Sequence, residues 1–143
     1  MPEYLKRRSG MAATEASAGT LEFLRGYYEA IDAGRAEEAL ARFAAEATVR
    51  AGNGAERPWM EGLREMAREL RGVVGTRHEI AAVVEGAGGE VAYEVEIAYQ
   101  LGGGREVSLA GAVFCAIRDG CFQHQHLYVD LAPLREALAA EGG

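Results

Sequence analysis

The second half of this chain alternates apolar and polar residues in four consecutive stretches, and this pattern constrains the fold more than any other feature. The stretches span residues 77–85, 90–101, 105–118 and 121–131. Glycine clusters at 86–89 and 102–104 and an Asp-Gly pair at 119–120 separate them. Alternation with a period of two is typical of half-buried strands, and short glycine-rich connections favour antiparallel neighbours. We therefore predict an antiparallel meander of four strands.

Apolar residues at helical spacing precede this sheet. The stretch 20–34 follows the helical period, with Thr20 as a capping residue and Gly34 as its end. The stretch 36–45 repeats the pattern before a short strand at 47–49, and further helices are predicted at 59–71 and 133–140. Helices followed by a sheet predict an α+β fold in one domain, residues 20–140. Residues 1–19 lack any such pattern and are predicted to form a flexible tail.

The composition of the chain limits which classes of binding partner and which locations are expected. A chain of 143 residues with 49% apolar residues buries roughly 68–70% of its unfolded surface, enough for one domain. A net charge of −7 repels phosphate backbones, so we expect no nucleic-acid partner. No apolar run approaches the roughly 20 residues that cross a bilayer, and no secretory signal begins the chain, so a cytoplasmic location is expected. The two cysteines, Cys115 and Cys121, are expected to be reduced.

The Asp119-Gly120 pair predicts how the last two strands pair. Asp-Gly favours a two-residue type I′ turn, which places Arg118 opposite Cys121 and continues without interruption along the strands. On this register one face of the hairpin joins the alternating row of the preceding strand and faces the helices. The residues of this predicted inner face are Tyr93, Val95, Ile97, Tyr99, Ala110, Ala112, Phe114, Gln123, Gln125, Leu127 and Val129.

The opposite face of the strand at 105–118 is apolar too. Its residues are Val107, Leu109, Val113, Cys115 and Ile117. An antiparallel strand that is apolar on both sides needs cover on both sides, once by helices and once by another surface. In a chain of this size we expect a second copy, hence a homodimer through the outer sheet face. His124, His126 and Tyr128, with the nearby Glu94 and Glu96, would make polar contacts across that interface.

The helix-turn-helix, the strand entry at 47–49, the meander and the ending Tyr128-Val129-Asp130 resemble one known family. It contains nuclear transport factor 2, the ketosteroid isomerases and the SnoaL-type polyketide cyclases, and the resemblance covers about residues 21–134. It implies a cone-shaped fold of three N-terminal helices packed on a curved, mainly antiparallel sheet. It also implies that Tyr27 matches the first-helix tyrosine that donates a hydrogen bond to the substrate oxygen in ketosteroid isomerases.

The acids of the characterised relatives are missing from the matching positions. The general-base aspartate of a ketosteroid isomerase would fall at Arg50 or Ala51, and its second aspartate near Ala112. The catalytic aspartate of limonene epoxide hydrolases matches Leu127, and their arginine-aspartate pair is replaced by the run at 93–97. Neither the histidine nor the aspartate of SnoaL-type cyclases lies on the predicted inner face. The resemblance therefore implies the cone-shaped fold of these relatives without their catalytic residues.

What remains is a mainly apolar pocket between helices and sheet. Small alanines leave room there, and two amides and a phenol suit a flat hydrophobic ligand of about 300–500 Å³. Tyr27 and Gln125 are the predicted catalytic residues. The predicted ligand-binding residues are Trp59, Leu63, Met66, Tyr93, Val95, Ala112, Phe114, Gln123 and Leu127. Ordinary core packing would also explain Tyr27, Trp59 and Met66, so both roles stay open.

Together these features favour a cofactor-independent cyclase or isomerase acting on a polyketide- or terpenoid-like molecule in secondary metabolism. One alternative is a non-catalytic protein that binds or sequesters a hydrophobic metabolite, and another is a dimerisation module with a filled cone. On the outer face, His124, His126 and Cys115 are three metal-capable residues, but a closed zinc site needs four ligands, so no metal is expected. His78 is expected at the surface, and Asp130 is expected to cap the chain where it leaves the sheet.

Overall fold

The computed structural model describes residues 14–142 of the chain. It is built from helices on a curved sheet, which confirms the predicted α+β class. The helices are α2 (Ala18–Asp32), α3 (Ala36–Leu40), α4 (Trp59–Glu69), α5 (Ala132–Gly142) and the short 3-10 helix η1 (Ala87–Gly89). Within residues 14–142, none of the helices is both long enough and apolar enough to cross a membrane.

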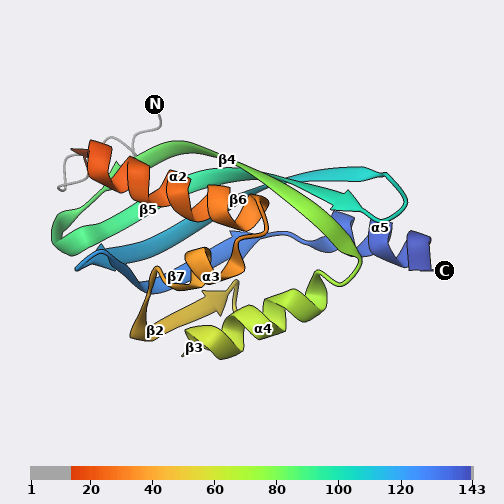
Figure 1. Cartoon of the computed structure of the whole chain (residues 1–143), viewed down its shortest axis with the longest axis horizontal. Helices are drawn as coiled ribbons and strands as arrows, with labels where there is room; N and C mark the ends of the chain where they lie inside the picture. Colours follow the sequence, from red (N-terminus) through yellow and green to blue (C-terminus); the bar gives the residue numbers. More distant parts are fainter. Residues whose placement is uncertain (1–13, 143) are drawn as a thin grey trace.

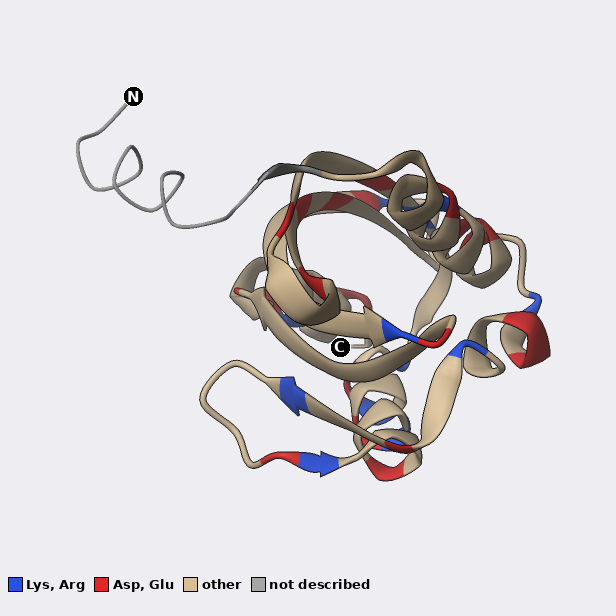
Figure 2. Ribbon diagram, turned by 90° about the vertical axis from the view of Figure 1, so that its left-hand side faces the viewer, with Lys and Arg blue, Asp and Glu red and all other residues tan. Residues whose placement is uncertain are grey.

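Within the described residues one sheet contains seven strands in the order β1-β4-β5-β6-β7-β2-β3. Their bounds are β1 Thr14–Glu15, β2 Phe43–Ala51, β3 Arg57–Pro58, β4 Val73–Glu85, β5 Glu90–Leu101, β6 Glu106–Arg118 and β7 Cys121–Val129. The meander from β4 to β7 is antiparallel as predicted, whereas β2 runs parallel to β7. Figure 1 shows α2 lying across the strands of the meander and α4 beside β2. Figure 2 shows the sheet curving so that these two helices face each other across its inner side.

The first helix begins earlier than predicted. Ser17 is its N-cap, and the Ser17 hydroxyl accepts a hydrogen bond from the Thr20 amide at 3.2 Å. The predicted domain start at residue 20 therefore falls inside α2, and β1 lies in the predicted tail, whose residues 1–13 are outside the described part. The helix ends as predicted, because Gly34 adopts a φ of 76° that favours glycine.

The second helix is shorter than predicted, because tertiary contacts recruit its last residues into β2. The prediction of helix through residue 45 is wrong: α3 ends at Leu40 and β2 starts at Phe43. The Phe43 ring stacks on Trp59 with centroids 4.9 Å apart and lies 5.1 Å from Phe122. Such aromatic contacts outweigh the small difference in local helix propensity.

The hairpin between β6 and β7 has the predicted turn but not the predicted register. Asp119 and Gly120 have φ values of 55° and 72°, as a type I′ turn requires. Ile117 pairs with Phe122, but the next pair joins Ala116 to His124, so Gln123 is an extra residue in a β-bulge. The Gln123 amide donates to the Arg118 carbonyl oxygen at 2.9 Å instead of facing inward.

The bulge reverses the predicted faces of β6. Beyond Gln123 every residue of β7 is shifted by one position relative to β6, and a shift of one exchanges the two faces. Val113 and Cys115 are each 1% exposed and face the helices, whereas Phe114 is 49% exposed on the outer face. The prediction that Ala110, Ala112 and Phe114 line the inner face is therefore wrong. The row from Val107 to Ile117, predicted to face outward, lies inside.

Candidate functional site

The interior of the cone carries hydrogen-bond donors from three elements. α2 contributes Tyr27 and Tyr28, β5 contributes Tyr93, and β7 contributes Gln125. All four side chains are buried, with exposed fractions between 2% and 7%. The apolar rings of Phe43 and Phe122 lie against Tyr27, at centroid distances of 5.9 and 4.9 Å. We call the three hydroxyls and the Gln125 amide the donor group.

The tyrosine hydroxyls of the donor group stay protonated. Burial raises the pKa of Tyr27 to about 12, a rise that the neighbouring Gln125 amide partly opposes. Burial also raises the pKa of Tyr28 and of Tyr93 well above the usual value. The hydroxyls of Tyr28 and Tyr93 lie 2.7 Å apart and share one hydrogen bond, so the accepting hydroxyl keeps a proton available for another acceptor.

Gln125 differs from the rest of the donor group. In the described part of the chain it is the one buried residue with a wholly polar side chain, and it is 2% exposed. Its Nε2 atom is buried and makes no hydrogen bond of ordinary length, although the amide lies near enough to Tyr27 to lower the pKa of that hydroxyl. A buried unpartnered donor costs about 1–3 kcal/mol. Gln125 pairs with Val49 and Cys115, which are both buried, so the amide faces the interior of the cone.

The side of the cone that α4 covers is less completely buried. Here Leu63, Met66 and Leu70 of α4 are only half-buried, and Leu63 and Leu70 pack against the buried core. Leu127 and Val129 on β7 are half-buried as well, although they follow the buried Gln125 on the same face. α4 approaches β2 most closely at Gly62, where a Cβ atom would lie 2.0 Å from Val49 Cγ2. The apolar stripe of α4 thus covers a part of the cone that is not closed.

The structure brings together most, but not all, of the predicted site residues. Those on the inner side are Tyr27, Trp59, Leu63, Met66, Tyr93, Val95, Gln125 and Leu127. Trp59 stacks on Phe43, and Val95 is 3% exposed opposite Gly111. The predictions for Ala112, Phe114 and Gln123 are wrong because of the bulge at Gln123.

An aspartate-histidine pair, which the sequence prediction missed, lies between α2 and β4. The His78 Nδ1 atom is 2.6 Å from Asp32 Oδ1, and the backbone amide of His78 donates to Asp32 Oδ2 at 2.8 Å. The Thr76 hydroxyl donates to Asp32 Oδ1 at 2.9 Å. The His78 ring stacks on Tyr28 with centroids 4.6 Å apart. The expectation of a surface histidine is wrong, because the side chain is only 11% exposed.

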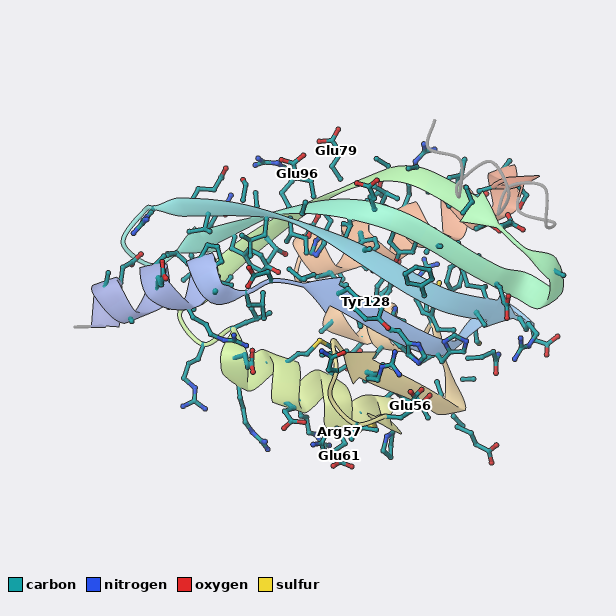
Figure 3. The ribbon with its side chains drawn as sticks, turned by 180° about the vertical axis from the view of Figure 1, so that it is seen from behind. Glu56, Arg57, Glu61, Glu79, Glu96 and Tyr128 are labelled. Atoms are coloured by element: carbon teal, nitrogen blue, oxygen red, sulfur yellow. The ribbon has the colours of Figure 1, made fainter. Side chains whose placement is uncertain are left out.

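The outer-face histidines His124 and His126 lie apart from Cys115. Cys115 lies on the inner face, across the sheet from His124 and His126. His126 Nε2 is 2.9 Å from a Glu56 carboxylate oxygen, and burial lowers the pKa of His124. Figure 3 shows Glu56 and Tyr128 on this side of the molecule. Within residues 14–142 no three His, Cys, Asp or Glu side chains are grouped so that they could hold a metal ion.

Two of the surface hollows in the described structure lie outside the cone. One follows the first half of α2 beside Arg42. The other lies on the outer face of β4, β5 and β6, and is lined by Glu79, Ala81, Glu94, Val95, Glu96 and Ala110. Neither contains a member of the donor group, so the expected pocket of about 300–500 Å³ stays a prediction.

Comparisons with known proteins agree with the geometry of the fold. Residues 24–124 match the family model described as a SnoaL-like domain. A candidate hydroxylase, AclR from Streptomyces galilaeus, superposes with a TM-score of 0.73 at 13% identity, over 87% of this chain and 83% of that one. A candidate SnoaL-like polyketide cyclase from Jannaschia sp. CCS1 gives 0.70 at 13%, over 89% and 98%. An LEH-like epoxide hydrolase from M. tuberculosis gives 0.62 at 17%, over 83% and 88%. No curated protein matches the chain.

Proposed function

The chain belongs to the SnoaL-like domain family, and from this premise we propose that it is a cofactor-independent enzyme of the cyclase or isomerase type. Its substrate is a hydrophobic polyketide- or terpenoid-like molecule that carries a carbonyl oxygen. The observation that carries this proposal is the buried, unpartnered Nε2 atom of Gln125 beside the tyrosine hydroxyls. An acceptor oxygen of a ligand would satisfy it.

The donor group suits a carbonyl oxygen that gains negative charge. Protonated hydroxyls and an amide can donate to such an oxygen, and in a site without water these bonds are stronger than in solution. The raised pKa values of the tyrosines keep them as donors throughout the physiological range. The group therefore favours reactions that pass through an enolate, which include double-bond isomerisation and ring closure by carbon-carbon bond formation.

The side of the cone that α4 covers would hold the carbon skeleton of the substrate. Leu63, Met66 and Leu127 would contact it, since their half-buried side chains have apolar surface left to cover. Removing that surface from water stabilises binding by roughly 25 cal/mol per Å². The skeleton would then hold the oxygen end toward Gln125, two residues along β7 from Leu127.

A non-catalytic binding protein is the second candidate. The observation that favours it is the composition of the donor group, which contains no carboxylate and no imidazole. Such a group can recognise an oxygen without moving a proton. Turnover separates the two candidates, because a binding protein would form the same contacts and leave its ligand unchanged.

The binding part of the proposal is tested with α-tetralone, a bicyclic apolar ketone, and with tetralin, its hydrocarbon counterpart. Calorimetric titration should show tighter binding of the ketone, and Gln125→Leu should remove the preference, worth about 0.5–1.5 kcal/mol. Gln100→Leu is the matched control, because this glutamine of β5 is exposed on the outer face of the sheet. Equal affinity for both compounds in the wild-type protein would contradict the proposal.

The catalytic part is tested with thioesters of short poly-β-ketone chains as model substrates. New cyclic products should form with the wild-type protein, and Tyr27→Phe should slow their formation more than it weakens substrate binding, because the hydroxyl then acts mainly in the transition state. Tight binding of the thioesters without any product would instead favour the binding protein.

A further inference from the structure

We propose that His78 is the general base of the cone and that Asp32 is its positioning residue. This inference rests on the proposed function and names the group that would move the proton. His78 faces the inner side of the sheet, because it pairs with Ile97, whose side chain is buried on that side. The donor group holds no carboxylate and no imidazole, so a base for the proposed reaction has to come from another part of the cone.

Asp32 determines which nitrogen of His78 is basic. A carboxylate only accepts hydrogen bonds, so the Nδ1 atom that lies 2.6 Å from Asp32 Oδ1 must carry the proton. The lone pair then belongs to Nε2. This is the arrangement in which an acidic partner fixes the tautomer and the orientation of a histidine base. Asp32 is itself held by the Thr76 hydroxyl and by the backbone amide of His78.

The Nε2 atom of His78 is available for a substrate. Among the described residues it makes no hydrogen bond, and it is not among the fully buried unpartnered atoms, so it keeps some exposed surface. The titratable groups against this ring are Asp32 and Tyr28, both from α2. Tyr28 stacks on the imidazole and its hydroxyl bonds to Tyr93, so one ring joins the base to the donor group.

The proposed step balances within the protein and the substrate. Nε2 takes a proton from a carbon beside the carbonyl group, and the electron pair of that C–H bond moves to the carbonyl oxygen. The donor group holds the resulting enolate oxygen. In an isomerisation the imidazolium returns its proton to another carbon of the enolate. In a cyclisation the enolate carbon attacks a second carbonyl group, and the imidazolium protonates the new alkoxide.

The test uses nitrobenzisoxazole, an apolar probe that reports a positioned base without knowledge of the natural substrate. A base removes its C–H proton, the C–H electrons form a nitrile, and the N–O bond breaks to give a coloured phenolate. The wild-type protein should accelerate this reaction beyond an equal concentration of free imidazole. His78→Gln should lower the rate about a hundredfold or more.

Two further variants separate a base from a structural histidine. His124→Ala removes another histidine, on the outer face, and should leave the rate unchanged. Asp32→Asn should lower kcat more than it raises KM, because the substrate contacts remain while the tautomer is no longer fixed. A His78→Gln variant that is folded by circular dichroism and retains the wild-type rate would overturn the proposal.

Two measurements distinguish this inference from the proposed function. NMR of the wild-type imidazole nitrogens should show the proton on Nδ1 of His78, and a proton on Nε2 alone would overturn the assignment without any variant. If α-tetralone binds and Gln125→Leu weakens it, but His78→Gln does not affect nitrobenzisoxazole turnover, the proposed function stands and the base lies elsewhere. If neither probe interacts with the wild-type protein, both proposals fail.

Discussion

Burial of the tyrosine hydroxyls of the donor group inside the cone links the site to the stability of the protein. The folded pKa of Tyr27 is about 12, above its ordinary value of 10.0, and the pKa values of Tyr28 and Tyr93 are also raised. A group whose folded pKa is raised stabilises the native state fully below its unfolded pKa and loses this contribution as the pH rises. The donor group is therefore stable where the tyrosines are protonated and vulnerable in alkali.

The first prediction follows from the raised pKa values of these tyrosines. The free energy of unfolding should fall as the pH rises from 10 toward 12, because the unfolded chain releases tyrosine protons that the native state retains. Near-ultraviolet absorbance of tyrosinate and far-ultraviolet circular dichroism should be followed together. The buried tyrosines Tyr27, Tyr28 and Tyr93 should ionise only when the chain unfolds. Early ionisation of every tyrosine without loss of structure would contradict the burial of the donor group.

The contact between α4 and β2 is the feature that positions the wall of the cone at the scale of elements. Gly62 leaves no room for a side chain, since a Cβ atom would lie 2.0 Å from Val49 Cγ2. Gly62→Ala should destabilise the protein by about 1–3 kcal/mol through overpacking, in spite of the better helix propensity of alanine. Denaturant unfolding measures the change. Gly19→Ala in α2, where a Cβ atom meets nothing within 4 Å, is the control and should be neutral or stabilising.

Elements with local signals could be predicted from the sequence, whereas elements that depend on distant contacts could not. The strands of the meander and the Asp119-Gly120 turn have signals within a few residues. The bulge at Gln123 has none, although in the folded chain the Gln123 amide donates to the Arg118 carbonyl oxygen. This single inserted residue reverses the predicted faces of β6. The site predictions for Ala112, Phe114 and Gln123 are wrong for this reason. The start of β2 at Phe43 likewise depends on Trp59 and Phe122.

The candidate site shows the same division. Tyr27 and Gln125 carry signals in the sequence, because the family resemblance marks the tyrosine and the alternating strand pattern places the glutamine on the inner face. The Asp32-His78 pair joins residues 46 positions apart in the sequence and exists only because α2 crosses β4. No periodicity connects a residue at a helix end to one in the middle of a strand, so the sequence offered no signal for this pair.

At the scale of the whole molecule, the outer face of the sheet carries exposed aromatic side chains. Its exposed aromatic side chains are Phe114 and Tyr128, whose rings are 5.9 Å apart, with the small Ala112 beside them. One border of this face is acidic, with Glu79 opposite Glu96, and the other carries Arg50 next to His126. Figure 3 shows Tyr128 between the acidic border and the border that carries Glu56. A twofold axis near β6 would place the acidic border of one copy against Arg50 of the other.

We propose that a second copy of the chain occupies this face, and the last prediction tests it. Phe114→Asp should convert a dimer into a folded monomer in sedimentation analysis, because an unpaired charge inside an interface costs several kcal/mol. Val74→Asp, at an apolar residue that is 70% exposed elsewhere, should leave the mass unchanged. Val113→Asp should instead unfold the chain, since that side chain is 1% exposed inside the cone. A wild-type monomer at micromolar concentration, or a dimeric Phe114→Asp variant, would show that this face is not the interface.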